Sequence, residues 1–298
     1  MKKLFTLLVA LGPLFHTFAQ ESTNFSSLRQ PVSAPGTTPA ETAVAISKSF
    51  LGRPYVPHTL DVNETEQLVV NFRAFDCTTF LETTLALSLT RHQLLSDPDS
   101  VQFERVFRKN LTQIRYRNGI INGFASRLHY FSEWLVDNEQ KGILRDVTQK
   151  IGGMQVSKPV SYMTKSTWKY PQLSDPKNRQ QIALIESAIS QQSFWFIPKK
   201  QIRQIENSLK EGDIIMLTAS RPGLDMKHVG FVVWQTDSTG ERRAHLLHAS
   251  SQAGEVMISA EPLADYVQWN RQFSGIRVAR LKETATQNLS YKDARRIN

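Results

Sequence analysis

The chain contains 298 residues, of which 36 are Lys or Arg and 27 are Asp or Glu, giving a formal net charge of +9. This length suffices for one large domain or two small ones. The basic residues are spread without a dense block and no nucleic-acid-binding motif is recognisable, so a nucleic-acid partner is not expected. A basic surface suits an anionic polymer such as a cell wall, or it serves solubility alone.

The N-terminus has the pattern of a secretory signal. Met1-Lys2-Lys3 is the charged start, an apolar run continues to Phe18, and Ala19 is the small residue at the expected cleavage point. The run is too short for a membrane anchor, and no cysteine follows it to carry a lipid. We therefore expect an exported protein, periplasmic or secreted, without a membrane anchor. Its expected parts are a signal peptide at 1–19, a Ser/Thr/Pro-rich linker or extended arm at 20–42 and a single domain at 43–298.

The only cysteine opens a predicted helix. Asp76 is a natural N-cap for it, and apolar residues follow at steps of three and four, namely Phe80, Leu81, Leu85 and Leu89. A thiol in the first turn lies beside free backbone N–H groups and the positive end of the helix dipole, which favour the thiolate. Cys77 could instead be a buried structural residue. A lone cysteine in an exported protein is a liability unless it is used, so a functional thiol is favoured.

Helices dominate the predicted elements up to residue 210. Before the cysteine we expect a helix over 43–51, an extended passage over 52–57 and a strand over 66–73. After it, the expected elements are a loop and helix over 96–110, a structured loop over 114–123, a helix over 126–138 capped by Ser126, a strand over 143–154, a loop over 161–170, a helix over 182–192, a strand over 193–198 and a helix over 200–209.

Two β-rich runs at 228–234 and 244–249 predict an antiparallel hairpin. With the turn centred near Ser238, residues whose numbers sum to about 476 lie opposite one another. This register places His228 across from His248 on the same face of the sheet. Further strands are expected at 214–217 and 275–281.

A thiol at a helix start and two histidines on one face of a hairpin are what a cysteine hydrolase needs. The thiol must give its proton to a nearby base, and a third polar group must orient that base. Cys77 would be the nucleophile, His228 the base and later the acid, and His248 the orienting residue. Zinc binding by the same residues is less favoured, because a structural site would want four ligands, and neither a metal nor another cofactor is expected. A wall-binding module without turnover is the interpretation from another class.

The same residues occur in the order and spacing of a known family. The segments that carry the likeness are Gly52-Arg53-Pro54-Tyr55, Asp76-Cys77-Thr78-Thr79-Phe80, Gly212-Asp213-Ile214-Ile215, His228-Val229-Gly230-Phe231 and Leu247-His248-Ala249-Ser250. Together they resemble the NlpC-type cell-wall cysteine hydrolases. The resemblance implies an α+β fold with a papain-like core, in which N-terminal helices carry the nucleophile and an antiparallel sheet carries the histidines. It also implies a Cys-His-His triad that cuts amide bonds in peptidoglycan, and it gives Tyr55 a part in stabilising the oxyanion.

The stretch at about 96–210 is longer than in a minimal family member, and we treat it as a largely helical insertion. Its signature, with Asn118-Gly119, Asn122-Gly123 and the run from Arg127 to Phe131, resembles the N-acetylmuramoyl-L-alanine amidase-like branch. The expected substrates are peptidoglycan fragments (muropeptides), cut between N-acetylmuramic acid and L-alanine, with the γ-D-glutamyl bond to the diamino acid as the alternative. The expected substrate contacts are Asp76, Arg127, His129, Tyr130 and Asp225, and a monomer is expected.

Overall fold

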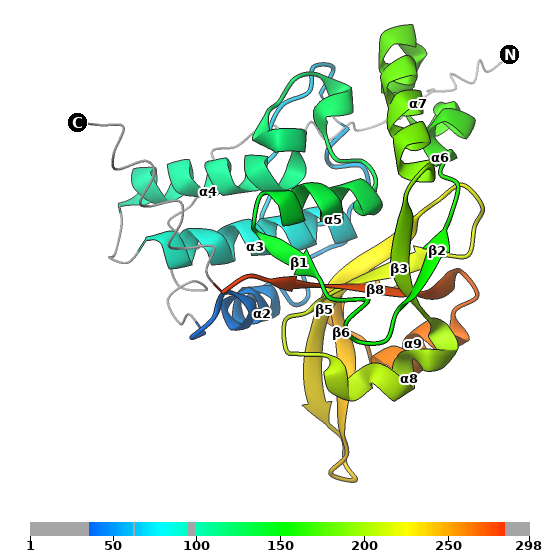
Figure 1. Ribbon diagram of the computed structural model, residues 1–298. Coiled ribbons are helices and arrows are strands. Elements are labelled where there is room, and N and C mark those ends of the chain that lie inside the picture. Colours follow the sequence, from blue (N-terminus) through cyan, green and yellow to red (C-terminus); the bar gives the residue numbers. More distant parts are fainter. Residues whose placement is uncertain (1–35, 62, 95–98, 284–298) are drawn as a thin grey trace, which may run out of the picture.

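The computed structural model in Figure 1 describes residues 36–61, 63–94 and 99–283. The expected signal peptide and most of the expected arm lie outside these residues. The described α-helices are α2 (Pro39–Ser49), α3 (Cys77–Gln93), α4 (Ser100–Arg115), α5 (Phe131–Gln140), α6 (Tyr162–Lys165), α7 (Pro176–Ser190), α8 (Ile202–Ile205) and α9 (Leu263–Trp269). The described strands are β1 (Leu144–Asp146), β2 (Met154–Ser157), β3 (Ser193–Pro198), β4 (Ile214–Ala219), β5 (Met226–Thr236), β6 (Arg242–Ser250), β7 (Glu255–Ile258) and β8 (Phe273–Leu281). Helices combined with an antiparallel sheet confirm the α+β class.

The strands form one antiparallel sheet in the order β2-β3-β8-β4-β5-β6-β7, and β1 pairs with β8. The strand that comes last in the sequence, β8, therefore lies inside the sheet. Strands β1 and β3 come from the predicted insertion, and both pair with β8. Residues 96–210 thus contribute to the main sheet as well as supplying helices.

Both faces of the sheet are covered by helices, as Figure 1 shows around β8, and the two faces of β4 belong to different cores. Successive side chains of a strand point to opposite faces, so Ile214 and Met216 join the core formed with α2, α3, α4 and α5. Ile215 and Leu217 join a second core formed with α8 and α9. Burial on both faces explains the continuous apolar run that predicted this strand.

Helix α3 is buried on all sides, whereas the sequence predicted one apolar face. Every residue from Thr79 to Thr90 is buried. Two of its polar residues are accommodated by hydrogen bonds to carbonyl groups: Ser88 Oγ donates to Pro39 O at 2.6 Å, and Thr90 Oγ1 donates to Ala86 O at 2.7 Å. A hydroxyl that is bonded in this way can be buried at little cost, so the periodicity of apolar residues understates the burial of this helix.

The strand predicted over 66–73 is absent, and this segment is irregular. Its carbonyl groups bond to side chains of other elements rather than to a neighbouring strand. Arg115 Nη1 donates to Val69 O at 2.7 Å, and the Tyr116 hydroxyl lies 3.1 Å from Gln67 O. The apolar residues in the middle of this segment suggested a strand, but the sequence could not show that its carbonyl groups bond to side chains instead.

Other predicted boundaries also change. The helix expected from Ser126 begins only at Phe131, because residues 124–126 form a 3-10 turn and Arg127 is extended. The strand expected over 143–154 is two strands, β1 and β2, separated by a turn in which Gly152 has φ +108°. The loop at 161–170 contains the short helix α6, and the helix at 200–209 is broken into α8 and flanking 3-10 turns. Helix α7 starts at Pro176, with Asp175 as its N-cap.

Candidate active site

Asp76 caps α3 as predicted and fixes the position of the thiol. Its Oδ1 accepts the backbone N–H of Thr79 at 2.7 Å, while Thr79 Oγ1 accepts the Asp76 N–H at 2.9 Å. This reciprocal pair is a capping box. Cys77, the first helical residue, is half-buried, and its sulfur accepts a hydrogen bond from the backbone N–H of Val229 in β5. The thiol is therefore held against the strand residue that directly follows His228.

The resting state of Cys77 differs from the thiolate that its place in the helix predicted. Burial and, after it, the neighbouring carboxylate of Asp76 raise the pKa of Cys77 to about 12. The hydrogen bonds from Val229 and Thr78 act in the opposite direction without reversing this shift. At neutral pH Cys77 is accordingly a thiol, and it must lose its proton during any reaction in which the sulfur attacks.

The two histidines of the hairpin are in contact. His228 Nε2 lies 2.6 Å from His248 Nδ1, and the rings are nearly perpendicular, at 82°. Burial lowers the pKa of His248 to about 4, and burial together with His248 lowers the pKa of His228 well below its usual value. Both rings are therefore neutral at pH 7, so one nitrogen of the contact donates a hydrogen and the other accepts it.

The predicted register of this hairpin is wrong by two in the summed residue numbers. Thr236 pairs with Arg242 and Phe231 with Leu247, so paired numbers sum to 231 + 247 = 478. The turn between β5 and β6 is centred on Thr239 rather than Ser238. An even shift keeps every side chain on its predicted face, so the two histidines still share one side of the sheet.

The corrected register gives Gly230 a structural role. It places His248 opposite Gly230, and His228 reaches His248 along a diagonal. A Cβ atom on Gly230 would lie 2.9 Å from His248 Cβ and 2.7 Å from Leu247 O. Both distances are too short for a real side chain, so a glycine is required where the His248 ring is seated.

A cavity of about 310 Å³, which we call the Tyr55 pocket, opens beside the start of α3. It brings together four residues that the sequence suggested, namely Tyr55, Asp76, Arg127 and His129. Tyr55 is half-buried and packs against the core cluster beside Cys77. Burial and, next, the charge of an ionised Cys77 raise the pKa of Tyr55, so its hydroxyl keeps its proton and can donate it in a hydrogen bond.

Arg127 and His129 are fixed in the wall of this pocket. Arg127 is only 6% exposed, and its Nη2 donates to Asp61 Oδ1 at 2.7 Å. His129 Nε2 lies 2.8 Å from Phe124 O, which can only accept, so this nitrogen carries the hydrogen. Burial, followed by the charge of Arg127, lowers the pKa of His129 to about 3. His129 is therefore neutral at pH 7 and serves as a rigid wall.

Sequence reasoning missed a buried ion pair in the same pocket. Arg115 Nε lies 2.6 Å from Glu82 Oε2, and each side chain is 1% exposed. Asp61 and Tyr170 also line the pocket without having been predicted. Arg115 and Glu82 come from different helices, so no local motif could have indicated that they meet.

Tyr130 and Asp225, two further predicted contacts, are buried and line no part of the Tyr55 pocket. The Tyr130 hydroxyl donates to Glu186 Oε1 at 2.6 Å. Asp225 accepts the backbone N–H groups of Ser132 at 2.8 Å and Met226 at 2.6 Å, joining the start of α5 to β5. Burial raises the pKa of Asp225. Both side chains therefore make structural contacts inside the protein.

Most of the chain matches a known protein family. Residues 45–276 match the AmiA-like family, described as N-acetylmuramoyl-L-alanine amidase-like. The chain belongs to this family. It is therefore a member of an amidase-like family of peptidoglycan hydrolases, in agreement with the branch that the insertion suggested.

Several solved structures are similar to most of the chain. An N-acetylmuramoyl-L-alanine amidase from Bacteroides uniformis is 34% identical over 82% of this chain and 99% of its own, with a TM-score of 0.74. A Bacteroides fragilis protein named "putative xylanase" is 36% identical over 79% of this chain and 99% of its own, with a TM-score of 0.71. A Legionella pneumophila protein at 21% identity, covering 86% of this chain and 91% of its own with a TM-score of 0.58, shares the fold. Comparison with curated proteins gives no match.

None of the described helices combines the length and apolar character that crossing a bilayer requires. Within the same residues, no group of three or more His, Cys, Asp or Glu side chains is arranged to hold a metal ion.

Proposed function

We propose that this family member is a cysteine hydrolase with a papain-like core, which cleaves the amide between N-acetylmuramic acid and L-alanine. The observation that carries the proposal is the hydrogen bond from Val229 N–H to the Cys77 sulfur. It holds the thiol beside His228, which in turn contacts His248 at 2.6 Å. The proposed nucleophile, base and orienting residue are thereby brought to one place, as covalent catalysis requires.

The contact between the histidines assigns the nitrogen that acts as the base. Nε2 of His228 is hydrogen-bonded to His248, so Nδ1 of His228 is the nitrogen proposed to take the thiol proton. For Nδ1 to be free of hydrogen, Nε2 must carry it and donate to His248 Nδ1. His248 thereby fixes the tautomer and orientation of the base. Its own low pKa keeps it neutral and able to accept that hydrogen bond.

In the first half of the reaction, the Cys77 sulfur attacks the amide carbonyl carbon while its proton passes to His228 Nδ1. Because the pKa of the thiol is about 12 and that of His228 is low, we propose that proton transfer accompanies the attack rather than preceding it. The carbonyl electrons move to oxygen, and the Tyr55 hydroxyl and the Cys77 backbone N–H stabilise this oxyanion. The C–N bond then breaks, and His228 returns the proton to the leaving amine of L-alanine.

The second half of the reaction releases the acyl group. Water gives a proton to His228 and attacks the thioester carbonyl, and the C–S bond breaks. The muramoyl carboxylic acid leaves, and the sulfur recovers its proton from His228. We propose that Asp76, Arg127 and His129 shape the cleft that selects the bond. If Arg127→Ala left the turnover of every wall fragment unchanged, this part of the proposal would fail.

Digestion of purified muropeptides by the wild-type and Cys77→Ala proteins, with the products weighed by mass spectrometry, tests the proposal. Released sugar and intact stem peptide from the wild type alone would support the amidase. A shortened stem would instead indicate cleavage of the γ-D-glutamyl bond to the diamino acid. If both proteins are folded and neither changes the muropeptides, the remaining interpretation is a wall-binding module without turnover.

We also propose that the protein is exported. The support is the N-terminal signal pattern, which suits an enzyme whose substrate lies outside the cytoplasm. Sequencing the N-terminus of the protein recovered from the producing cells checks this part. A mature chain that begins at Gln20 is expected, whereas a chain that retains Met1 to Ala19 would contradict export by this signal.

A further inference from the structure

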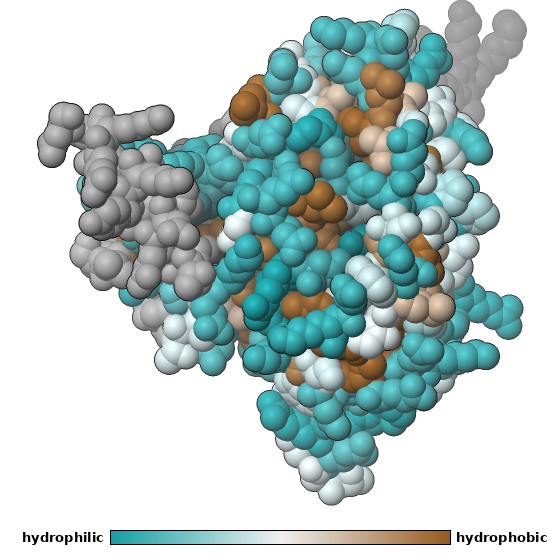
Figure 2. Space-filling view, in the orientation of Figure 1, coloured by the Kyte–Doolittle hydropathy of each residue, from teal (hydrophilic) through white to brown (hydrophobic). Residues whose placement is uncertain are grey.

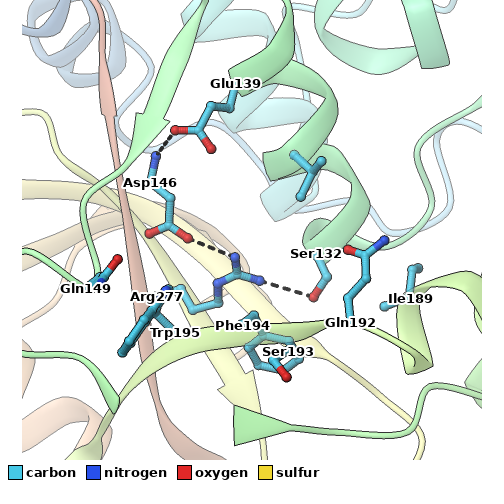
Figure 3. A pocket seen from close by; sticks show the side chains of 11 residues that line it. Ser132, Glu139, Asp146, Gln149, Ile189, Gln192, Ser193, Phe194, Trp195 and Arg277 are labelled. Carbon is cyan, nitrogen blue, oxygen red and sulfur yellow. Dashed lines mark hydrogen bonds and ion pairs between the residues drawn. The ribbon is translucent and has the colours of Figure 1, made fainter. Parts of the chain in front are cut away.

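A second cavity, which we call the Arg277 pocket, lies between α5, β1, β3 and β8 (Figure 3). Its volume is about 330 Å³, at the lower end of the range for small-molecule sites. It shares no lining residue with the Tyr55 pocket and contains neither the thiol nor the histidines. The proposed reaction makes no use of this cavity.

The buried guanidinium of Arg277 forms part of the wall of this pocket. The Arg277 side chain is 4% exposed; its Nη2 lies 2.9 Å from Asp146 Oδ2, and its Nη1 lies 3.3 Å from Ser132 Oγ. Its guanidinium also lies over the ring of Phe194, 4.9 Å from the centroid. Figure 3 shows the guanidinium between Asp146 and Ser132. Its Nε has no hydrogen-bond partner within the described part of the chain, so these contacts do not satisfy this buried group fully.

The remaining polar groups of the pocket offer both donors and acceptors. Glu139 lines the cavity and accepts the backbone N–H of Asp146 at 3.0 Å, which leaves its other oxygen available to a ligand. Gln149 and Gln192 each bring an amide with donor and acceptor atoms. Trp195 adds the surface of a half-buried indole.

The charges of the wall argue against an anionic ligand. Arg277 is the one cation of the lining, and Asp146 already pairs with it. Glu139 adds a second carboxylate, so the lining side chains sum to 1 − 2 = −1. A ligand rich in carboxylates, such as the stem peptide, would meet unpaired negative charge. A neutral ligand with several hydroxyl groups would find acceptors in the carboxylates and donors in the guanidinium and amides.

We infer that the Arg277 pocket binds one neutral pyranose ring of the peptidoglycan glycan. A pyranose presents hydroxyl groups around its edge and an apolar C–H face that can lie against an indole, and one ring fits a cavity of this size. Identifying the sugar as a wall sugar rests on the proposed function. The geometry itself indicates a saccharide site separate from the reacting bond.

The two pockets lie on either side of the start of α5. Phe131 lines the Tyr55 pocket, and the next residue, Ser132, lines the Arg277 pocket. Figure 2 shows the face of the molecule that carries α5 and β3 as mostly hydrophilic, with separate apolar patches, as suits a sugar polymer more than an apolar partner.

Binding of a peptide-free probe, the N-acetylglucosamine trisaccharide, to the full-chain Cys77→Ala protein tests the inference by titration calorimetry. Saturable binding is expected, weakened at least about tenfold by Trp195→Ala, because loss of a stacked ring of this kind costs more than about 1.4 kcal/mol. Trp168→Ala is the matched control, because that indole is 74% exposed and lies outside the pocket. Gln149→Ala, at a pocket residue outside the regular strands, gives a second variant should Trp195→Ala fold poorly.

Absence of saturable binding, or equal binding by the Trp195→Ala and Trp168→Ala proteins, would overturn the inference. Binding of the stem peptide alone that Trp195→Ala abolishes would overturn it in favour of a peptide site. Because no turnover is needed, these outcomes are distinguishable from failure of the proposed function. Cleavage of muropeptides without binding of the trisaccharide would contradict only the saccharide site. Binding of the trisaccharide without cleavage would contradict only the proposed enzyme activity.

Discussion

Burial has opposite consequences at the thiol and at the Arg277 pocket. Around Cys77 it keeps the reacting groups neutral, because it raises the pKa of Cys77 to about 12 and lowers that of His248 to about 4. Arg277 is buried at least as deeply, but Asp146 at 2.9 Å gives its charge a partner. A buried thiol or imidazole can become neutral, whereas a guanidinium keeps its charge and therefore needs a partner such as Asp146 when it is buried.

The charge states of these groups suit proton transfer at the thiol and ligand orientation at the Arg277 pocket. A neutral thiol and a neutral imidazole can exchange a proton during a reaction without separating charge beforehand. A paired guanidinium and carboxylate keep their charges and can only orient what they touch. Variants that exchange these properties test the contrast, beginning with the one that should change most.

His228→Ala should reduce muropeptide turnover by about 10⁴-fold, the scale on which a catalytic group of this kind is lost. The physical reason is that this variant lacks the imidazole that is proposed to take the Cys77 proton. Turnover of purified muropeptides measures the loss. His245→Ala is the control, because His245 lies three residues from His248 on the other face of β6, where its Nδ1 contacts Ser259 O at 2.8 Å. Equal losses in both variants would show that the effect is structural.

Arg277→Met should lower the free energy of unfolding by about 3 kcal/mol, because it leaves the Asp146 carboxylate without its charged partner. Urea unfolding measures this cost. Arg203→Met provides the matched control: Arg203 pairs with Asp265 at 2.7 Å, but its side chain is 56% exposed. That exposed pair should contribute about 1 kcal/mol or less. Similar losses from both substitutions would contradict the contrast between a buried and an exposed pair.

Stability should fall as the pH drops from 6.5 to 4. A histidine whose pKa is lowered by folding binds its proton more weakly in the folded state, so its contribution is present above pH 6.5 and is lost toward the folded pKa. For His248, with a pKa of about 4, the loss approaches about 3 kcal/mol. Urea unfolding at several pH values measures it. The fall should be smaller in His248→Asn, and parallel curves for the two proteins would refute this assignment.

Gly230→Ala should cost about 2 kcal/mol of stability through overpacking, and it should also reduce kcat by displacing His248. The added Cβ would meet Leu247 O at 2.7 Å. Gly240→Ala, in the turn of the same hairpin, separates the two effects. Nothing lies within 4 Å of its Cβ, but its φ of +85° strains an alanine, and about 1 kcal/mol without a change in kcat is expected there. An unchanged kcat in Gly230→Ala would contradict the proposal that this glycine positions His248.

Local rules account for the parts of the site that the sequence predicted. Asp76 caps α3 because a capping residue and its partner lie three positions apart. The shared face of His228 and His248 survived a wrong turn centre, because side chains alternate with a period of two. The start of α5 had no such signal: Tyr130 caps it without a side-chain hydrogen bond, so the helix was predicted to begin too early.

The parts that could not be predicted depend on contacts between distant segments. Glu82 and Arg115 are 33 residues apart, and Asp146 and Arg277 are 131 residues apart. The high pKa of Cys77 likewise follows from burial, which outweighs the helix start that favoured a thiolate. Sequence spacing indicates which groups are present, while the state of charge of each one depends on what folding places beside it.

The place of β8 in the sheet has a consequence for how the protein is made. Strands β1, β3 and β4 all pair with this last described strand, so none of them has its full set of backbone partners until β8 is available. Contacts over such sequence separations form slowly, because a long loop must close first. A partly synthesised chain therefore lacks the strand that joins the two halves of its sheet, and it stays open for most of its synthesis.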